Sequence, residues 1–328
     1  MKFGPLPLVD AEGAVLAHSV RAGGILKKGT VLGPDDLSRL ADAGVAEVTV
    51  ARPDPGDLSE DEAARRIADC LSGEGLKQGR AATGRANILA TGAGLVRVDA
   101  SSVAAANAID EGVTLATLSD HARVSRGQLL ATVKIIPYFV PGAVVDEVAT
   151  ALGQGALKLL PFRGGRVRLV MTRTSDFKDS LLKKGEAIVR ARVEGIGYTL
   201  EDVVVVPHET EAVADALAVD ADLVLILGAS ATSDRRDVAP AGVIAAGGQV
   251  TRFGMPVDPG NLLFMGLVNK TPIVGLPGCA RSPALNGADW VLERLGAGLD
   301  VSDADIAAMG VGGLLKEMPD RPHPRESI

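Results

Sequence analysis

Residues 222–237 read DLVLILGASATSDRRD, an apolar stretch that passes directly into a small and polar one. The run of five apolar residues at 223–227 is typical of a strand that is buried on both faces of a parallel sheet. The loop after it begins with Gly228 and Ala229, which are small enough for a ligand to approach the backbone. We therefore expect a central strand whose carboxyl end opens onto a binding loop.

Strands and helices alternate on both sides of this stretch. We predict strands at 166–172, 202–206, 222–227, 249–253 and 272–276, and helices at 180–195, 209–218, 238–246 and 283–295. The valines at 203–206 form a second continuous apolar run, which also predicts a buried strand. Repeated strand–helix–strand units predict an α/β fold, a mostly parallel sheet with helices on both faces in a Rossmann-like three-layer arrangement.

The N-terminal half has weaker patterns. Residues 29–50 indicate a turn, a helix, a turn and a strand, and Ser59 with Glu62 three residues later indicates a capping box that begins a helix at 58–71. Further predicted elements are helices at 101–109 and 141–152 and strands at 113–118 and 129–136.

These patterns predict a smaller α/β or α+β domain at 1–155, which would cover a cleft or dimerise. A Gly- and Pro-containing linker at 153–165 would join it to the α/β domain at 161–298. Residues 299–328 are expected to hold a C-terminal helix and a flexible tail, disordered over 319–328.

Composition excludes several classes of protein. The length of 328 residues suggests two domains, and a net charge of −7 argues against a nucleic-acid partner. The apolar runs are too short to cross a membrane, and the first residues lack the pattern of a secretory signal. Because Cys70 and Cys279 are far apart and form no CxxC motif, a cytoplasmic location is expected.

Small and polar residues follow several predicted strands, in loops at 172–179, 228–237, 257–261 and 275–282. Because ligands bind outside the carboxyl ends of parallel strands, these loops are the expected binding site. Thr172, Thr174 and Ser175 are predicted to cap the next helix and to donate to an anion. Asp234 and Asp237 lie three residues apart at a helix start, so both can face one side and hold Mg²⁺ through water.

Sequence motifs typical of several other kinds of functional site are absent from the chain. The chain contains neither the GxxxxGK[ST] nor the GxGxxG pattern of nucleotide-binding loops, and no GxSxG pattern of a serine nucleophile. The four histidines, His18, His121, His208 and His323, show no spacing that favours a metal site.

The order of these loops resembles the molybdopterin-binding domain shared by molybdopterin molybdenumtransferases and molybdopterin adenylyltransferases, over about 166–295. Gly228, Ala229, Ser230 and Asp237 stand where that family has Gly-Gly-x-Ser-x-Gly and an essential Asp. Further along, 259–261 (PGN) stands for Pro-Gly-Lys-Pro, and 276–279 (LPGC) for Leu-Pro-Gly-Asn-Pro. Residues 29–53 also resemble a segment that, in the transferases, runs straight into this domain.

The resemblance implies a pterin-phosphate ligand, molybdopterin or its nucleotide-linked form, and a role in molybdenum cofactor biosynthesis. It implies Asp237 and Asp234 as catalytic and Mg²⁺-binding residues, with molybdate insertion or a nucleotidyl step as the reaction. The residues it implies for ligand binding are Thr174, Ser175, Gly228, Ala229, Ser230, Thr232, Ser233, Pro259, Gly260, Asn261, Pro277, Gly278 and Cys279.

Two alternatives stay open. A non-catalytic carrier would hold the cofactor and deliver it to a molybdenum hydroxylase, and a metal-dependent nucleotide pyrophosphatase could use a similar domain. In each case we expect a cytoplasmic protein, a dimer or other homo-oligomer, with neither nucleic acid nor membrane as partner.

Overall fold

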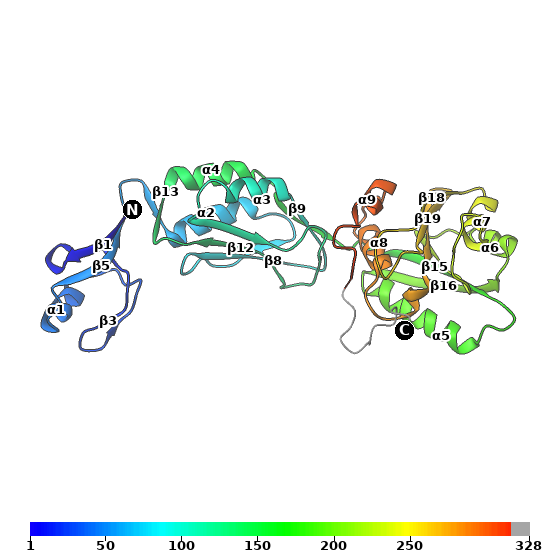
Figure 1. Cartoon of the computed structure of the whole chain (residues 1–328), viewed down its shortest axis with the longest axis horizontal. Helices are drawn as coiled ribbons and strands as arrows, with labels where there is room; N and C mark the ends of the chain where they lie inside the picture. Colours follow the sequence, from blue (N-terminus) through cyan, green and yellow to red (C-terminus); the bar gives the residue numbers. More distant parts are fainter. Residues whose placement is uncertain (316–328) are drawn as a thin grey trace, which may run out of the picture. The chain divides into compact units, whose positions relative to one another are not determined.

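The computed structural model describes residues 1–315, so the predicted disordered tail at 319–328 lies outside the described residues. The chain divides into two compact units, Met1–Leu160 (unit 1) and Pro161–Ile328 (unit 2) (Figure 1). Among residues 1–315, every helix is too short or too polar to span a bilayer.

Unit 2 is built on a six-stranded sheet with the order β16-β15-β17-β20-β19-β18. Its strands are β15 (Gly165–Arg173), β16 (Tyr198–Pro207), β17 (Leu223–Leu227), β18 (Gln249–Phe253), β19 (Phe264–Val268) and β20 (Thr271–Leu276). The first four strands in this order pair in parallel, whereas β19 is antiparallel to both β20 and β18. β18 therefore runs in the same direction as β17. This confirms a mostly parallel sheet, with β19 as a reversed strand that the sequence analysis did not predict.

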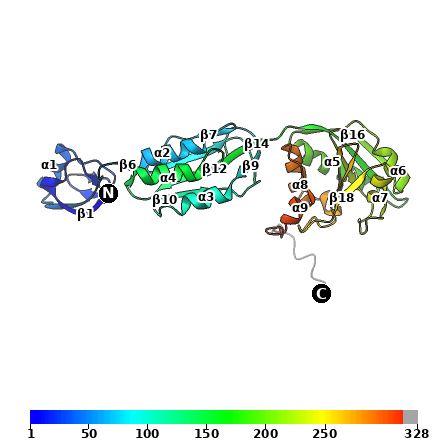
Figure 2. The same ribbon diagram turned by 90° about the horizontal axis from the view of Figure 1, so that it is seen from above.

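Helices cover both faces of this sheet (Figures 1 and 2). The side chains of β17 alternate between the two faces of the sheet. Leu223, Leu225 and Leu227 belong to one hydrophobic cluster, and Val224 and Ile226 belong to the other. The first cluster includes α5 (Asp179–Glu194), α8 (Gly287–Gly296) and α9 (Asp303–Ala308), and the second includes α6 (Thr210–Ala216) and α7 (Val238–Ala245). Burying each of these aliphatic side chains contributes about 2 kcal/mol to the stability of the fold. Because β17 contributes to both clusters, it lies at the centre of the unit.

Two sequence predictions for unit 2 were wrong in detail. The valine run of β16 was expected to be buried, but β16 is the edge strand and Val205 is 45% exposed. The helix expected at 283–295 begins only at Gly287, because Asn286 Oδ1 accepts a hydrogen bond from the N–H of Ala288 and caps it.

Unit 1 is an α+β arrangement that contains several antiparallel strand pairs. Its helices are α1 (Pro34–Asp42), α2 (Glu60–Leu71), α3 (Ala100–Asn107) and α4 (Gly142–Leu152), with the 3-10 helix η1 (Leu8–Asp10). Its strands are β1 (Lys2–Pro7), β2 (Val15–Leu16), β3 (Val20–Arg21), β4 (Ile25–Leu26), β5 (Glu47–Arg52), β6 (Asp57–Ser59), β7 (Leu76–Gln78), β8 (Arg85–Ala90), β9 (Gly94–Val98), β10 (Val113–Thr117), β11 (Arg123–Val124), β12 (Leu129–Ile135), β13 (Phe139–Pro141) and β14 (Leu157–Pro161).

The N-terminal half is built around more than one hydrophobic core. It has two hydrophobic clusters, one drawn from residues 8–50 and one from residues 63–159. The predicted linker at 153–165 also contains strand β14, which pairs beside β9. Because Leu157 and Leu159 are buried in the second cluster, this segment belongs to the core of unit 1.

Asp99 gives unit 1 a specific acid sensitivity. Its carboxylate caps α3 by accepting hydrogen bonds from Ser101 and Ser102, which lowers the pKa of Asp99 to about 2. A lowered carboxyl pKa stabilises the fold above the ordinary value of 3.8, and the stabilisation is lost as the pH falls through about 2. Asp99→Asn keeps a capping oxygen without the titration. We expect chemical denaturation from pH 5 to pH 2 to show a shallower loss of stability in this variant, and parallel curves would contradict the assignment.

Candidate functional site

Three loops of unit 2 line one hollow of about 480 Å³. They follow β17, β18 and β20, whose common direction places their carboxyl ends at the same edge of the sheet. The lining residues are Gly228, Ala229, Ser230, Ala231, Asp258, Pro259, Gly260, Asn261, Leu262, Pro277, Gly278, Cys279 and Arg281. Nine of these were predicted to bind the ligand. The site is thus assembled by strand direction, as the sequence pattern predicts.

The second loop is fixed against the start of α8. Pro259 follows a cis peptide bond, and its carbonyl accepts a hydrogen bond of 2.8 Å from the N–H of Gly287. Gly260 has a φ of +141°, and a Cβ there would lie 2.7 Å from the backbone nitrogen of Gly287. Only glycine fits this position, so Gly260 shapes the wall of the hollow.

Gly278 faces open space. A Cβ built at this residue meets no heavy atom within 4 Å, and its φ lies outside the left-handed region. Gly278 begins the 3-10 helix η2 (Gly278–Arg281) directly after β20. A larger side chain can therefore be placed at this lining residue without straining the protein.

Thr172, at the end of β15, holds the first loop in place. Its side chain is completely buried, and its Oγ1 accepts a hydrogen bond of 2.7 Å from the N–H of Ala229. The same oxygen lies 2.8 Å from Nδ1 of His208, which follows β16. The ends of β15 and β16 thus position the loop after β17. The sequence analysis placed Thr172 in a helix cap and missed this role, because the contact joins residues 57 positions apart.

Thr174 and Ser175 neither line the hollow nor cap α5. The residue at the N-cap of α5 is Lys178, which makes no side-chain capping bond. The expected cap was wrong because residues 174–177 form a turn, in which the N–H of Phe177 donates to the carbonyl of Thr174. Thr232 and Ser233 also lie outside the lining residues.

Asp234 and Asp237 are engaged locally at the start of α7. Asp237 caps this helix, accepting hydrogen bonds from the N–H groups of Val238 (2.8 Å) and Ser233 (3.1 Å). Asp234 accepts from the side chain and backbone of Arg236, which lowers the pKa of Asp234. Neither carboxylate is among the residues that line the hollow. Within the described part of the chain, no three His, Cys, Asp or Glu side chains gather as a metal centre requires.

The capping role makes a prediction for Asp237. Replacing Asp237 by alanine removes the acceptor at the N-cap and should lower the free energy of unfolding by about 1 kcal/mol. Asp237→Asn keeps an acceptor oxygen and should remain close to the parent protein. Denaturation followed by the fluorescence of Trp290, the single tryptophan, measures this in unit 2. Equal stability of the alanine variant and the parent would contradict the capping role.

The sequence analysis did not assign four residues of the hollow: Ala231, Asp258, Leu262 and Arg281. Asp258 adds a carboxylate, and its backbone pairs with residues 313 and 315 near the end of the described chain. Arg281 lies within the loop that was singled out at 275–282, and its charge was the available signal. Cys279 adds a thiol whose pKa is raised by burial.

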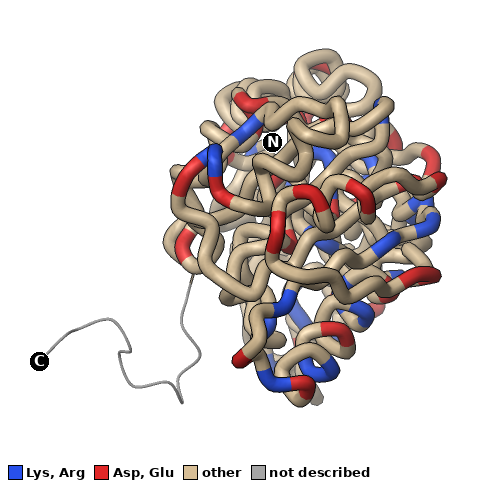
Figure 3. The backbone as a smooth tube through the Cα atoms, turned by 90° about the vertical axis from the view of Figure 1, so that its right-hand side faces the viewer, with Lys and Arg blue, Asp and Glu red and all other residues tan. Residues whose placement is uncertain are grey.

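Backbone donors remain available around the hollow. Within residues 1–315, the N–H groups of Ser230, Ala231, Gly278 and Cys279 donate to no protein acceptor. Unpaired backbone N–H groups that border a cavity are suited to hold the oxygens of an anion. Seen from the side of unit 2, acidic and basic residues are interspersed along the backbone (Figure 3). The four N–H groups are therefore candidate donors for an anion.

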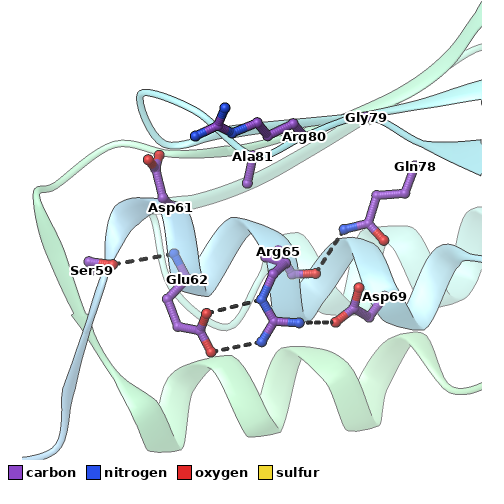
Figure 4. A pocket seen from close by; sticks show the side chains of 9 residues that line it. All are labelled: Ser59, Asp61, Glu62, Arg65, Asp69, Gln78, Gly79, Arg80 and Ala81. Atoms are coloured by element: carbon purple, nitrogen blue, oxygen red, sulfur yellow. Dashed lines mark hydrogen bonds and ion pairs between the residues drawn. The ribbon is translucent and has the colours of Figure 1, made fainter.

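A second hollow, of about 590 Å³, lies in unit 1 between α2 and the segment 78–81. Arg65 donates to Glu62 and Asp69 on its own helix, and its carbonyl accepts from Gln78 (Figure 4). Hydrogen bonds from the side chains of Arg65 and Arg66 to the Glu62 carboxylate lower the pKa of Glu62 to about 2. Arg65 is thus already bonded to two carboxylates of its own helix.

Comparisons with known proteins were made on the sequence and on the fold. Residues 5–52 match the family described as "Domain of unknown function (DUF8806)", and no curated protein matches the chain. Among solved structures, one similar chain is a molybdopterin biosynthesis MoeA protein from Pyrococcus horikosii. It has a TM-score of 0.31 and 15% identity, over 90% of this chain and 76% of that chain.

Two other solved structures are similar. A molybdenum cofactor biosynthesis protein from Pyrococcus furiosus has a TM-score of 0.25 and 14% identity, over 94% of this chain and 65% of that chain. A molybdenum cofactor biosynthesis protein B has a TM-score of 0.28 and 16% identity, over 40% of this chain and 88% of that chain. These structural neighbours are molybdenum cofactor biosynthesis proteins. At such TM-scores the likeness assigns no function to this chain.

Proposed function

We propose that unit 2 binds molybdopterin, as a phosphorylated pterin, in the hollow between its three loops and acts in molybdenum cofactor biosynthesis. The observation that carries this proposal is that the loops at 228–231, 258–262 and 277–281 line one hollow. These are the loops on which the sequence resemblance rests, and they come from three separate strands. A volume of about 480 Å³ also lies within the usual size of small-molecule sites.

The residues of the hollow suit different parts of such a ligand. The N–H groups of Ser230 and Ala231, with the Ser230 hydroxyl, are donors for phosphate oxygens. Pro259 and Pro277 present apolar surfaces that suit the flat faces of a pterin, and the Asn261 amide can both donate and accept. The proposal therefore places the phosphate on the first loop and the pterin between the second and third.

The geometry favours binding and delivery over catalysis. Asp234 and Asp237 hold the start of α7 and do not line the hollow, whereas a reacting carboxylate must touch the bound ligand. As a carrier, the protein would hand the cofactor to a molybdenum hydroxylase. The alternative form of the proposal is catalytic. In that form the protein carries out molybdate insertion or a nucleotidyl step, with Mg²⁺ held by Asp234 and Asp237.

Calorimetric titration with molybdopterin, followed by a thiol-labelling experiment, tests the proposed site. Cys279 lines the hollow, whereas Cys70 lies in unit 1, and burial raises the pKa of both thiols. Labelling with iodoacetamide at alkaline pH should slow at Cys279 when molybdopterin is bound, with Cys70 as the internal control. Binding without protection of Cys279 would place the ligand elsewhere.

Assays of the bound protein separate the remaining alternatives. A carrier shows binding without turnover when molybdate, Mg²⁺ and a nucleotide are added. A transferase shows turnover that Asp237→Asn abolishes, since this variant keeps the cap of α7 but loses the charge. Phosphate release from free nucleotides would instead identify a pyrophosphatase. Light scattering of the purified chain tests the proposed homo-oligomer.

A further inference from the structure

Arg281 lines the hollow, and among residues 1–315 no acidic side chain forms an ion pair with its guanidinium group. Its Nη2 donates to the carbonyl of Gly228 at 2.5 Å, and its Cζ lies 5.3 Å from the centre of the Phe177 ring. Its Nη1 is buried and donates to no acceptor. Burial lowers the pKa of Arg281, as expected for a cation that lacks a compensating charge.

Other partly buried arginines of unit 2 are neutralised. Arg168 is 17% exposed and pairs with Asp202, and Arg192 is 8% exposed and pairs with Asp289. A buried charge without a partner is costly, so proteins pair such groups or leave them for a ligand. Among the described residues, Arg281 donates only to a neutral carbonyl.

On the basis of the proposed function, we infer that Arg281 determines a preference of the hollow: a ligand that carries a phosphate group binds more tightly than the same ligand without it. A phosphate monoester has two negative charges, which the uncompensated positive charge of Arg281 attracts. The contact with Gly228 joins Arg281 to the first loop, where free N–H groups are available. Arg281 is thus a specificity residue for the anionic part of the ligand.

The test compares charged and uncharged ligands in the full chain. Inorganic phosphate, molybdopterin and phosphatase-treated molybdopterin are titrated by calorimetry into the parent protein, Arg281→Met and Arg281→Lys. Arg281→Met should weaken binding of phosphate and molybdopterin about tenfold or more, and change binding of the dephosphorylated pterin less than about twofold. Arg281→Lys keeps the charge and should retain most of the preference. Arg236→Met is the control, because Arg236 is 92% exposed and pairs with Asp234.

Each outcome has a distinct meaning. An equal loss for both pterins in Arg281→Met would show that Arg281 only positions Gly228, and an unchanged preference would show that it does not read the charge. Either result overturns the inference. If the parent binds phosphate through Arg281 but binds neither pterin, the proposed function fails and the inference stands. If the parent binds none of the three ligands, both fail.

Discussion

Gly278→Leu should abolish binding of molybdopterin, raising the dissociation constant at least about 100-fold. The physical reason is steric: Gly278 lines the hollow and a Cβ there meets nothing within 4 Å, so we expect the added side chain to take space that the ligand needs. Because the φ of this residue is open to other side chains and no neighbour must move, the free energy of unfolding should change by less than about 0.5 kcal/mol. Calorimetric titration and chemical denaturation measure the two quantities.

Gly73→Leu provides a matched control for this prediction. A Cβ at Gly73 also meets nothing within 4 Å, and Gly73 has an ordinary φ, but this residue belongs to unit 1 and to none of the three loops. We expect this variant to bind molybdopterin like the parent protein. If Gly278→Leu also bound normally, the ligand would not occupy the hollow.

Arg192→Met should cause the largest loss of stability, about 3–5 kcal/mol. Arg192 on α5 forms an ion pair with Asp289 on α8, and the two side chains are only 8% and 12% exposed. It also donates to the carbonyls of Ser282 and Ala284. Removing it leaves a buried carboxylate without its cation and frees the segment that joins η2 to α8.

Denaturation followed by Trp290 fluorescence measures this loss in unit 2. The double variant Arg192→Met with Asp289→Leu should recover much of the stability, because it removes both charges. Arg166→Met is the surface control: Arg166 is 42% exposed, and its pair with Asp220 should contribute at most about 1 kcal/mol. A loss in Arg192→Met no greater than in this control would contradict the role of the buried pair.

The sequence predicted unit 2 better than unit 1, for a physical reason. Buried strands such as β17, with helices of regular spacing between them, give strong periodic signals. The short antiparallel strands of unit 1, for example β2 and β11, have two residues each and no period that a pattern can show. β16 misled the analysis because a row of valines suits an exposed edge of a sheet as well as its centre.

The site was predictable as a set of loops but not as a set of contacts. Gly228, Pro259 and Gly278 could be predicted to lie near one another because strand direction alone brings their loops together. Asp237 was assigned to chemistry, although a carboxylate at a helix start serves equally as a cap. Thr172 was missed because its partner, Ala229, becomes its neighbour only after the sheet has formed.

The unpaired N–H groups of Ser230, Ala231, Gly278 and Cys279 have a practical consequence. An amide that donates to no protein atom exchanges its hydrogen for deuterium rapidly, whereas the ladders of the neighbouring strands exchange slowly. Any occupant that accepts hydrogen bonds from these four amides will retard their exchange. Mass spectrometry of the two corresponding peptides would therefore detect the natural ligand in a cell extract before its chemical identity is known.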